Sequence, residues 1–228
     1  MTPNLYLICL CIGFLFSISF FYFKNKSRLS EESFLHNYVF FIILYVLLFE
    51  FYAIYLVVAG KTNVIVYNIF FVIGETLLIL GYLRYLMERR EAKRAVFIFA
   101  MFFLIWAAIN GLYFQKITDL FQHYTHLLGS LGILFFSCYI MYKLLLSERF
   151  WDRPLFTVPH FWNVAAILLF YSPSFIYFGS LNLMWDIDRW YLNILASTNR
   201  IFAATLYLIL GLSFYSPIIF SGSSNGRR

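Results

Sequence analysis

Three ionisable side chains lie inside long apolar stretches of the sequence, namely Glu50, Glu75 and Arg200. A charged group in an apolar environment is costly, so each one is a candidate functional residue. Two carboxylates and a guanidinium group can bind a charged ligand or an ion, or carry charge across a membrane. They can equally join three helices as a structural ion pair, because buried pairs fix an arrangement more reliably than they add stability.

The three residues lie at similar depths if their stretches are helices that start from the same side. Counted from that side at 1.5 Å per residue, Glu50 is about 14 Å deep, Glu75 about 17 Å and Arg200 about 12 Å. We therefore expect one charged layer, in which Arg200 contacts at least one carboxylate and preferentially Glu75. The ligand-site or polar-cluster candidates on the same stretches are Asn68, Tyr82, Asn193, Ser197, Asn199 and Tyr207.

Helical spacing indicates which faces point inward. Asn68 and Tyr82 lie seven residues before and after Glu75 and form a polar stripe with it. The face around Arg200 carries small and polar residues, which favours close packing of helices. The residues of this face are Asn193, Ala196, Ser197, Ala203, Ala204, Tyr207 and Gly211.

Two histidines are the weak metal candidates. His123 and His126 are three residues apart, so both reach one helix face, as metal ligands do. The pattern is neither H-E-x-x-H nor the Glu-x-x-His of di-iron bundles, and a metal is not expected. The three cysteines also lack the spacing of a zinc site or a disulfide framework.

Composition places these residues in a membrane. Hydrophobic residues make up 62% of the 228-residue chain and charged residues 12%, whereas a soluble domain is about half apolar and a quarter charged. This excludes a soluble enzyme, a nucleic-acid-binding domain and a disordered chain. Seven runs are long enough to cross about 30 Å of hydrocarbon as helices. They cover roughly residues 5–23, 38–59, 64–86, 95–115, 123–145, 159–180 and 192–216.

The basic residues predict the orientation. Thirteen of the seventeen Lys and Arg residues follow the first, third and fifth runs or lie in the tail, whereas Lys61, Lys116 and Arg189 lie on the opposite side. Basic connections face the cytoplasm. We therefore predict an all-α bundle of seven transmembrane helices over residues 1–220, with the N-terminus outside and the C-terminus cytoplasmic. Residues 221–228 are predicted to be a flexible tail.

Seven spans with an outside N-terminus resemble the topology of rhodopsin-like receptors and microbial rhodopsins. The motifs differ, because microbial rhodopsins carry a mid-membrane lysine that binds retinal, and the seventh run has Arg200 and no lysine. Covalently bound retinal is therefore not expected, and no other cofactor is predicted.

The sequence more closely resembles small uncharacterised seven-helix membrane proteins of Bacteroidota-type bacteria. The resemblance is carried by His160-Phe-Trp-Asn, by Phe170-Tyr171 and by Leu192-Asn-Ile-Leu. Some relatives of that kind are associated with sensor kinases, so the resemblance implies a bacterial inner-membrane protein involved in signalling.

Three functions remain open. The first is a receptor-like or sensory module with an outward-facing polar pocket, which signals to a membrane or cytoplasmic partner through its basic loops. The second is a small proton- or ion-linked transporter that uses Glu50 and Glu75. The third is an intramembrane metal-dependent enzyme. The expected surroundings are the lipid bilayer, and no nucleic acid is expected as a partner.

Overall fold

The structure, a computed structural model, describes residues 3–24, 30–146, 155–183 and 189–220. This part of the chain contains helices and no β-strand, which confirms the all-α prediction. Seven helical segments in it are long and apolar enough to cross a membrane, as predicted, and they indicate a multi-pass membrane protein. The tail 221–228 lies outside the described residues.

The helical segments agree closely with the apolar runs. Helix α2 begins at Ser30, eight residues before its predicted start, and the third segment covers the predicted residues 64–86. The segments are α1 (Pro3–Lys24), α2 (Ser30–Val58), α3 (Val64–Val66) continued by η1 (Tyr67–Glu75) and α4 (Thr76–Leu86), α5 (Arg90–Ile109) continued by η2 (Asn110–Phe114), α6 (His123–Leu146), η4 (Leu155–Thr157), α7 (Pro159–Leu183), and α8 (Arg189–Leu212) continued by η5 (Ser213–Tyr215) and α9 (Ser216–Phe220).

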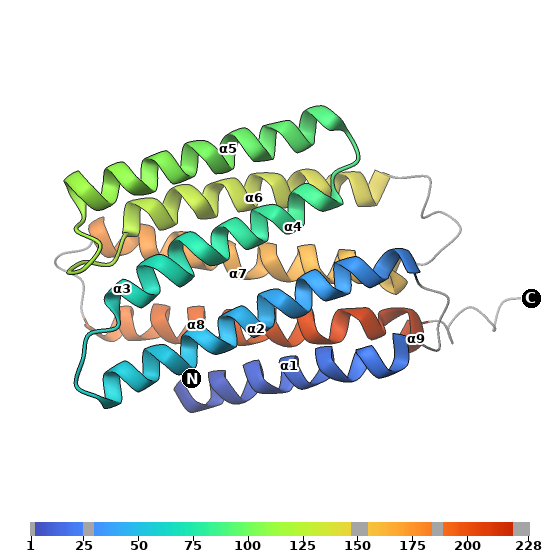
Figure 1. Ribbon diagram of the computed structural model, residues 1–228, viewed down its shortest axis with the longest axis horizontal. Coiled ribbons are helices and arrows are strands. Elements are labelled where there is room, and N and C mark those ends of the chain that lie inside the picture. Colours follow the sequence, from blue (N-terminus) through green and yellow to red (C-terminus); the bar gives the residue numbers. More distant parts are fainter. Residues whose placement is uncertain (1–2, 25–29, 147–154, 184–188, 221–228) are drawn as a thin grey trace, which may run out of the picture.

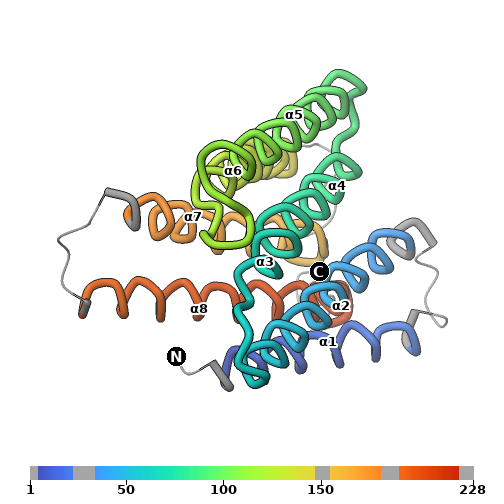
Figure 2. Tube along the Cα trace, turned by 60° about the vertical axis from the view of Figure 1, so that its left-hand side comes forward, coloured from blue at the N-terminus to red at the C-terminus, as the bar shows by residue number. Residues whose placement is uncertain are grey.

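The helices run up and down in an antiparallel bundle (Figure 1). We call the end where α1 begins the N-terminal end, and the end where α9 lies the C-terminal end. Helix α8 packs along both α1 and α7, and α7 packs along α6. Helix α2 lies beside α1, and α4 contacts both α2 and α6. Helix α5 lies at the edge of the bundle against α4 and α6 (Figure 2).

Glycines allow α1 and α8 to approach closely. A Cβ atom on Gly13 would overlap the backbone carbonyl of Tyr207, and one on Gly211 would overlap the carbonyl of Gly13. The predicted small-residue face of the seventh span therefore faces α1 at Gly211. Because the obstructing atoms belong to the opposite backbone, no side-chain rotation could make room there.

Tyrosines of α2 attach this helix to the third segment. The hydroxyl groups of Tyr38 and Tyr45 donate hydrogen bonds to the carbonyls of Leu78 and Phe70, at 3.1 Å each. Each ring tip lies over a glycine of the third segment, where a Cβ atom would overlap the hydroxyl. Near Phe70 the third segment is a π-helix, η1, with i→i+5 hydrogen bonds.

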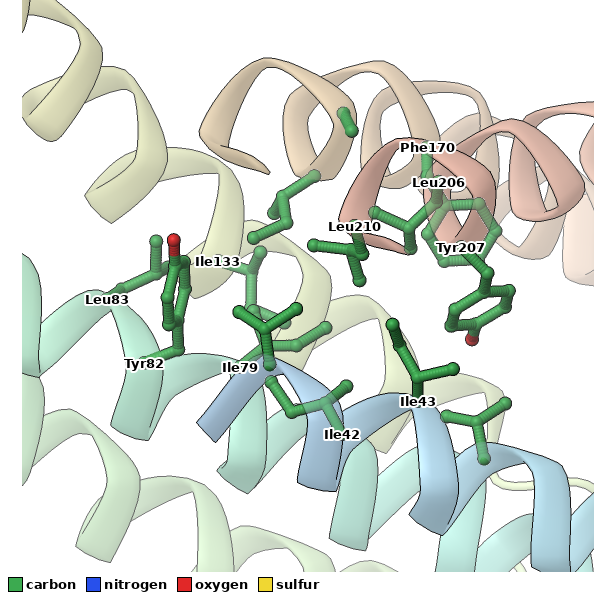
Figure 3. Close-up of a cluster of buried hydrophobic side chains, with 14 of the residues drawn as sticks. Ile42, Ile43, Ile79, Tyr82, Leu83, Ile133, Phe170, Leu206, Tyr207 and Leu210 are labelled. Carbon is green, nitrogen blue, oxygen red and sulfur yellow. The ribbon is translucent and has the colours of Figure 1, made fainter. Parts of the chain in front are cut away.

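A packed apolar layer fills the middle of the bundle (Figure 3). It is formed by side chains that converge from four helices and are almost completely buried. They are Ile42 and Ile43 of α2, Ile79 and Leu83 of α4, Ile133 of α6, and Leu206 and Leu210 of α8.

Candidate functional site

A cavity of about 450 Å³ lies among α1, α2, η1, α7 and α8. Asn63 in the α2–α3 connection and Phe121 in the α5–α6 connection line it, which places it toward the N-terminal end. Its volume falls in the range of small-molecule binding sites. The polar and aromatic lining residues are Glu50, Asn63, Asn199, Arg200, Tyr6, Tyr67, Phe71, Phe121, Phe170, Phe178 and Tyr207.

Glu50 is held by two tyrosines. The Tyr6 hydroxyl donates to Oε1 at 3.0 Å, and the Tyr67 hydroxyl donates to Oε2 at 2.9 Å. Tyr6 comes from the first turn of α1 and Tyr67 from the start of η1, so this carboxyl group joins three segments. Each of its oxygen atoms accepts one hydrogen bond at the wall of the cavity.

Glu75, the last residue of η1, is completely buried. Its Oε1 accepts a hydrogen bond of 2.9 Å from the Tyr207 hydroxyl, and its Oε2 has no hydrogen-bond partner in the described part of the chain. Tyr207 lines the cavity, and its ring packs edge-on against that of Tyr6 with centroids 6.2 Å apart. Glu75 is therefore connected to the cavity through one tyrosine.

The expected contact between Arg200 and Glu75 is wrong. Among the described residues, the Glu75 carboxyl group accepts a hydrogen bond from the Tyr207 hydroxyl at Oε1 and has no partner at Oε2. Glu75 is level with Tyr207, which it contacts. Arg200 lies seven residues before Tyr207 on α8, or about 10 Å closer to the N-terminal end. The sequence-based depth assumed that the seventh span starts level with its neighbours.

Arg200 instead lines the cavity that Glu50 also lines. Its side chain is exposed, in contrast to the two buried glutamates. Among the described residues, no hydrogen bond or ion pair holds its guanidinium group. The three charged residues therefore do not form an ion-paired staple, and no described residue occupies the donors of Arg200.

Asn68 is buried as predicted but does not line the cavity. Its side-chain amide donates to the carbonyls of Ile117 and Leu120, at 2.8 Å each. Its oxygen accepts a hydrogen bond of 3.0 Å from the backbone N–H of Gln122. Asn68 thus anchors the α5–α6 connection, whose Phe121 forms part of the cavity wall.

Tyr82 belongs to a separate buried cluster, closer to the C-terminal end. Its hydroxyl accepts a hydrogen bond of 2.9 Å from the Asn163 amide and lies 3.2 Å from Nδ1 of His160. The predicted stripe of Asn68, Glu75 and Tyr82 is thus buried along its whole length. Its three members nevertheless lie in different surroundings: Asn68 at the α5–α6 connection, Glu75 beside Tyr207, and Tyr82 beside Asn163 and His160.

Of the remaining candidates on α8, one lines the cavity and two do not. Asn199 lines the cavity, and its buried Oδ1 has no hydrogen-bond partner among residues 3–24, 30–146, 155–183 and 189–220. Asn193 is exposed, and neither it nor Ser197 is among the lining residues.

His123 and His126 belong to no group of three or more candidate metal ligands among the described residues. His126 is buried, and its Nε2 lies 3.1 Å from the Ser174 hydroxyl and 3.3 Å from the Ser130 hydroxyl. No group of three or more His, Cys, Asp or Glu residues in the described part of the chain could hold a metal ion.

An aromatic wall of the cavity was not identified from the sequence. Phe121 and Phe178 stack with centroids 4.9 Å apart, and Phe71 lies 6.4 Å from both. With 29 Phe and 18 Tyr in the chain, aromatic residues carry no positional signal. Tyr6 and Tyr67, the partners of Glu50, were missed for the same reason.

No protein-family model, curated protein or solved structure matches this chain. The function is therefore inferred from the geometry of the cavity and its lining residues.

Proposed function

We propose that the protein is a receptor-like membrane module that binds a small molecule in the cavity at its N-terminal end. The observation that carries the proposal is a cavity of about 450 Å³ lined by a guanidinium group without a partner among the described residues. Small-molecule sites are typically apolar with a few convergent polar groups, and this lining has that character.

In this proposal the N-terminal end faces the outside of a bacterial inner membrane. Arg84, Arg89, Arg90 and Lys143 lie toward the C-terminal end (Figure 1), and this excess of positive charge is typical of the cytoplasmic side. The cavity is then open to external ligands. A signalling partner would dock at the basic C-terminal end.

The packed layer below the cavity favours a receptor over a transporter. Ile43 and Leu210, which lie closer to the C-terminal end than the lining residues Glu50 and Tyr207 of the same helices, are almost completely buried (Figure 3). A transporter must open its site to each side of the membrane in turn, whereas a receptor needs access from one side only.

Cysteine labelling tests this proposal. Ala203 lines the cavity, whereas its neighbour Ala204 is buried and does not line it. Each is changed to Cys in a background where Cys9, Cys11 and Cys138 are replaced by Ser. We expect Ala203→Cys to react with an impermeant methanethiosulfonate reagent in right-side-out vesicles and Ala204→Cys to remain unreacted.

The same labelling separates the two functions. Reaction of Ala203→Cys in inside-out vesicles as well would favour the transporter. Absence of reaction from both sides, in protein that remains folded, would contradict an accessible cavity and with it the proposed function.

A further inference from the structure

The cavity contains a positive charge whose hydrogen-bond donors are not used by any described residue. Arg200 lines it, and no hydrogen bond or ion pair to Arg200 exists among the described residues. A guanidinium group has five N–H donors in a planar fork that matches the two oxygens of a carboxylate. Such charge-assisted pairs are about twice as strong as neutral hydrogen bonds.

Among the described residues, the Glu50 carboxyl group in the same cavity makes no hydrogen bond or ion pair with this fork. Glu50 is directed toward Tyr6 and Tyr67, and each of its oxygens accepts one of their hydroxyl groups, at 3.0 and 2.9 Å. A ligand therefore meets donors at Arg200 that no described residue occupies, and acceptors at Glu50 that each already accept a hydrogen bond.

Most of the remaining lining is aromatic or aliphatic, and on α8 it extends deeper than Arg200. Tyr207 is seven residues further along α8, or about 10 Å toward the middle of the bundle. On α7 the lining runs from Phe178 to Phe170, a distance of about 12 Å. We therefore expect the anionic group of a ligand at Arg200 and its apolar body against the aromatic side chains.

We propose that the ligand is a small amphipathic monocarboxylate whose carboxylate pairs with Arg200 and whose planar or aliphatic body occupies the aromatic part of the cavity. This inference rests on the proposed function, since it names the ligand class of the same cavity. A cavity of 450 Å³ corresponds to the volume of about fifteen water molecules. Acids of roughly ten to twenty non-hydrogen atoms therefore fit.

The charge of the cavity can be measured without knowing the ligand. Arg200 and Ala203 are three residues apart, so a cysteine at position 203 lies on the same helix face. We expect the anionic sulfonatoethyl methanethiosulfonate to modify Ala203→Cys about tenfold faster than the cationic trimethylammonium reagent, relative to a free thiol. The additional change Arg200→Gln should remove this preference, whereas Arg90→Gln, which changes an exposed arginine near the C-terminal end, should leave it.

Protection of the same cysteine tests the ligand class. The probes are 3-phenylpropionate, indole-3-acetate and octanoate, each compared with its neutral amide, and phenylalanine as a zwitterion. We expect the carboxylates to slow labelling in phosphatidylcholine nanodiscs and the amides and phenylalanine to protect less. Arg200→Gln should weaken protection about ten- to a hundredfold, and Arg200→Lys should restore part of it.

The outcomes separate the two proposals. If Ala203→Cys does not react with either reagent, the proposed function fails. If it reacts with both at equal relative rates, and no carboxylate protects better than its amide, the cavity remains and the anionic ligand is excluded. Stronger protection by phenylalanine would assign a zwitterion instead. Protection by added anionic phospholipid alone would assign the anion to a lipid, and each of these results overturns the monocarboxylate.

Discussion

The hydrogen bond between Tyr207 and Glu75 connects the cavity to the buried interior, and its contribution to stability can be measured. Tyr207 is 2% exposed and donates to Glu75 at 2.9 Å, while the other Glu75 oxygen accepts no hydrogen bond from any described residue. The change Tyr207→Phe keeps the ring that packs on Tyr6 and removes only the donor. It leaves a fully buried carboxyl group without a hydrogen bond.

Leaving a buried polar group unsatisfied costs about 1–3 kcal/mol, whereas replacing both partners by apolar groups can be nearly neutral. We therefore expect Tyr207→Phe to lower the free energy of unfolding by about 1–3 kcal/mol. The double change Tyr207→Phe with Glu75→Leu should cost less than the sum of the single changes, with a coupling of at least about 1 kcal/mol. Tyr191→Phe, on the exposed start of the same helix, should change stability by less than about 0.5 kcal/mol.

Reversible unfolding by SDS in mixed micelles, followed by circular dichroism, gives the four free energies of this cycle. A coupling below about 0.5 kcal/mol, which is the usual limit for independent sites, would refute the reasoning. Arg200→Gln supplies a second check in the same assay. Because Arg200 has no partner among the described residues, we expect only a small change, whereas a loss of about 3–5 kcal/mol would indicate a buried ion pair.

Three further predictions concern orientation and packing. In intact cells a Cys at Asn63 should react with an impermeant maleimide and a Cys at Ala92 should not, and the reverse pattern would overturn the orientation. Gly211→Ala should lower the free energy of unfolding by about 1–3 kcal/mol because its Cβ would overlap the α1 backbone, whereas Gly179→Ala, with its nearest atom at 3.4 Å, should be tolerated; equal effects would contradict the close approach. Asn68→Ala should cost about 3 kcal/mol, roughly 1 kcal/mol for each of its three hydrogen bonds, and native-state proteolysis near residue 118 should increase.

The helices could be predicted because crossing a bilayer imposes a strict length and composition. About 20 apolar residues are needed for each span, and seven runs meet this requirement. Helix ends were less certain where an apolar run continues into a polar one. Helix α2 extends back to Ser30, and α8 begins at Arg189, because a helix can continue beyond the hydrocarbon layer of the membrane.

Inward-facing positions could be predicted, but their partners could not. Asn68, Glu75 and Tyr82 are all buried, as the seven-residue spacing indicates. Their partners are a loop backbone, a tyrosine hydroxyl and a histidine with an asparagine, respectively. A spacing rule gives the face of a helix, whereas the partner depends on the height of each neighbouring helix. On α8 the residue that contacts Glu75 is Tyr207, seven residues after the predicted partner Arg200.

The π-helix η1 is the feature that no sequence pattern indicated, and it positions both carboxyl groups. It begins at Tyr67, the partner of Glu50, and ends at Glu75. An i→i+5 turn takes up one more residue than an α-turn, so each such insertion rotates the following residues by about 100° relative to a continuous α-helix. The α-helical spacing between Tyr67 and Glu75 therefore does not describe their relative directions. Wide turns of this kind occur frequently at functional sites, and here η1 connects Tyr67, which holds Glu50 at the cavity, with Glu75 below it.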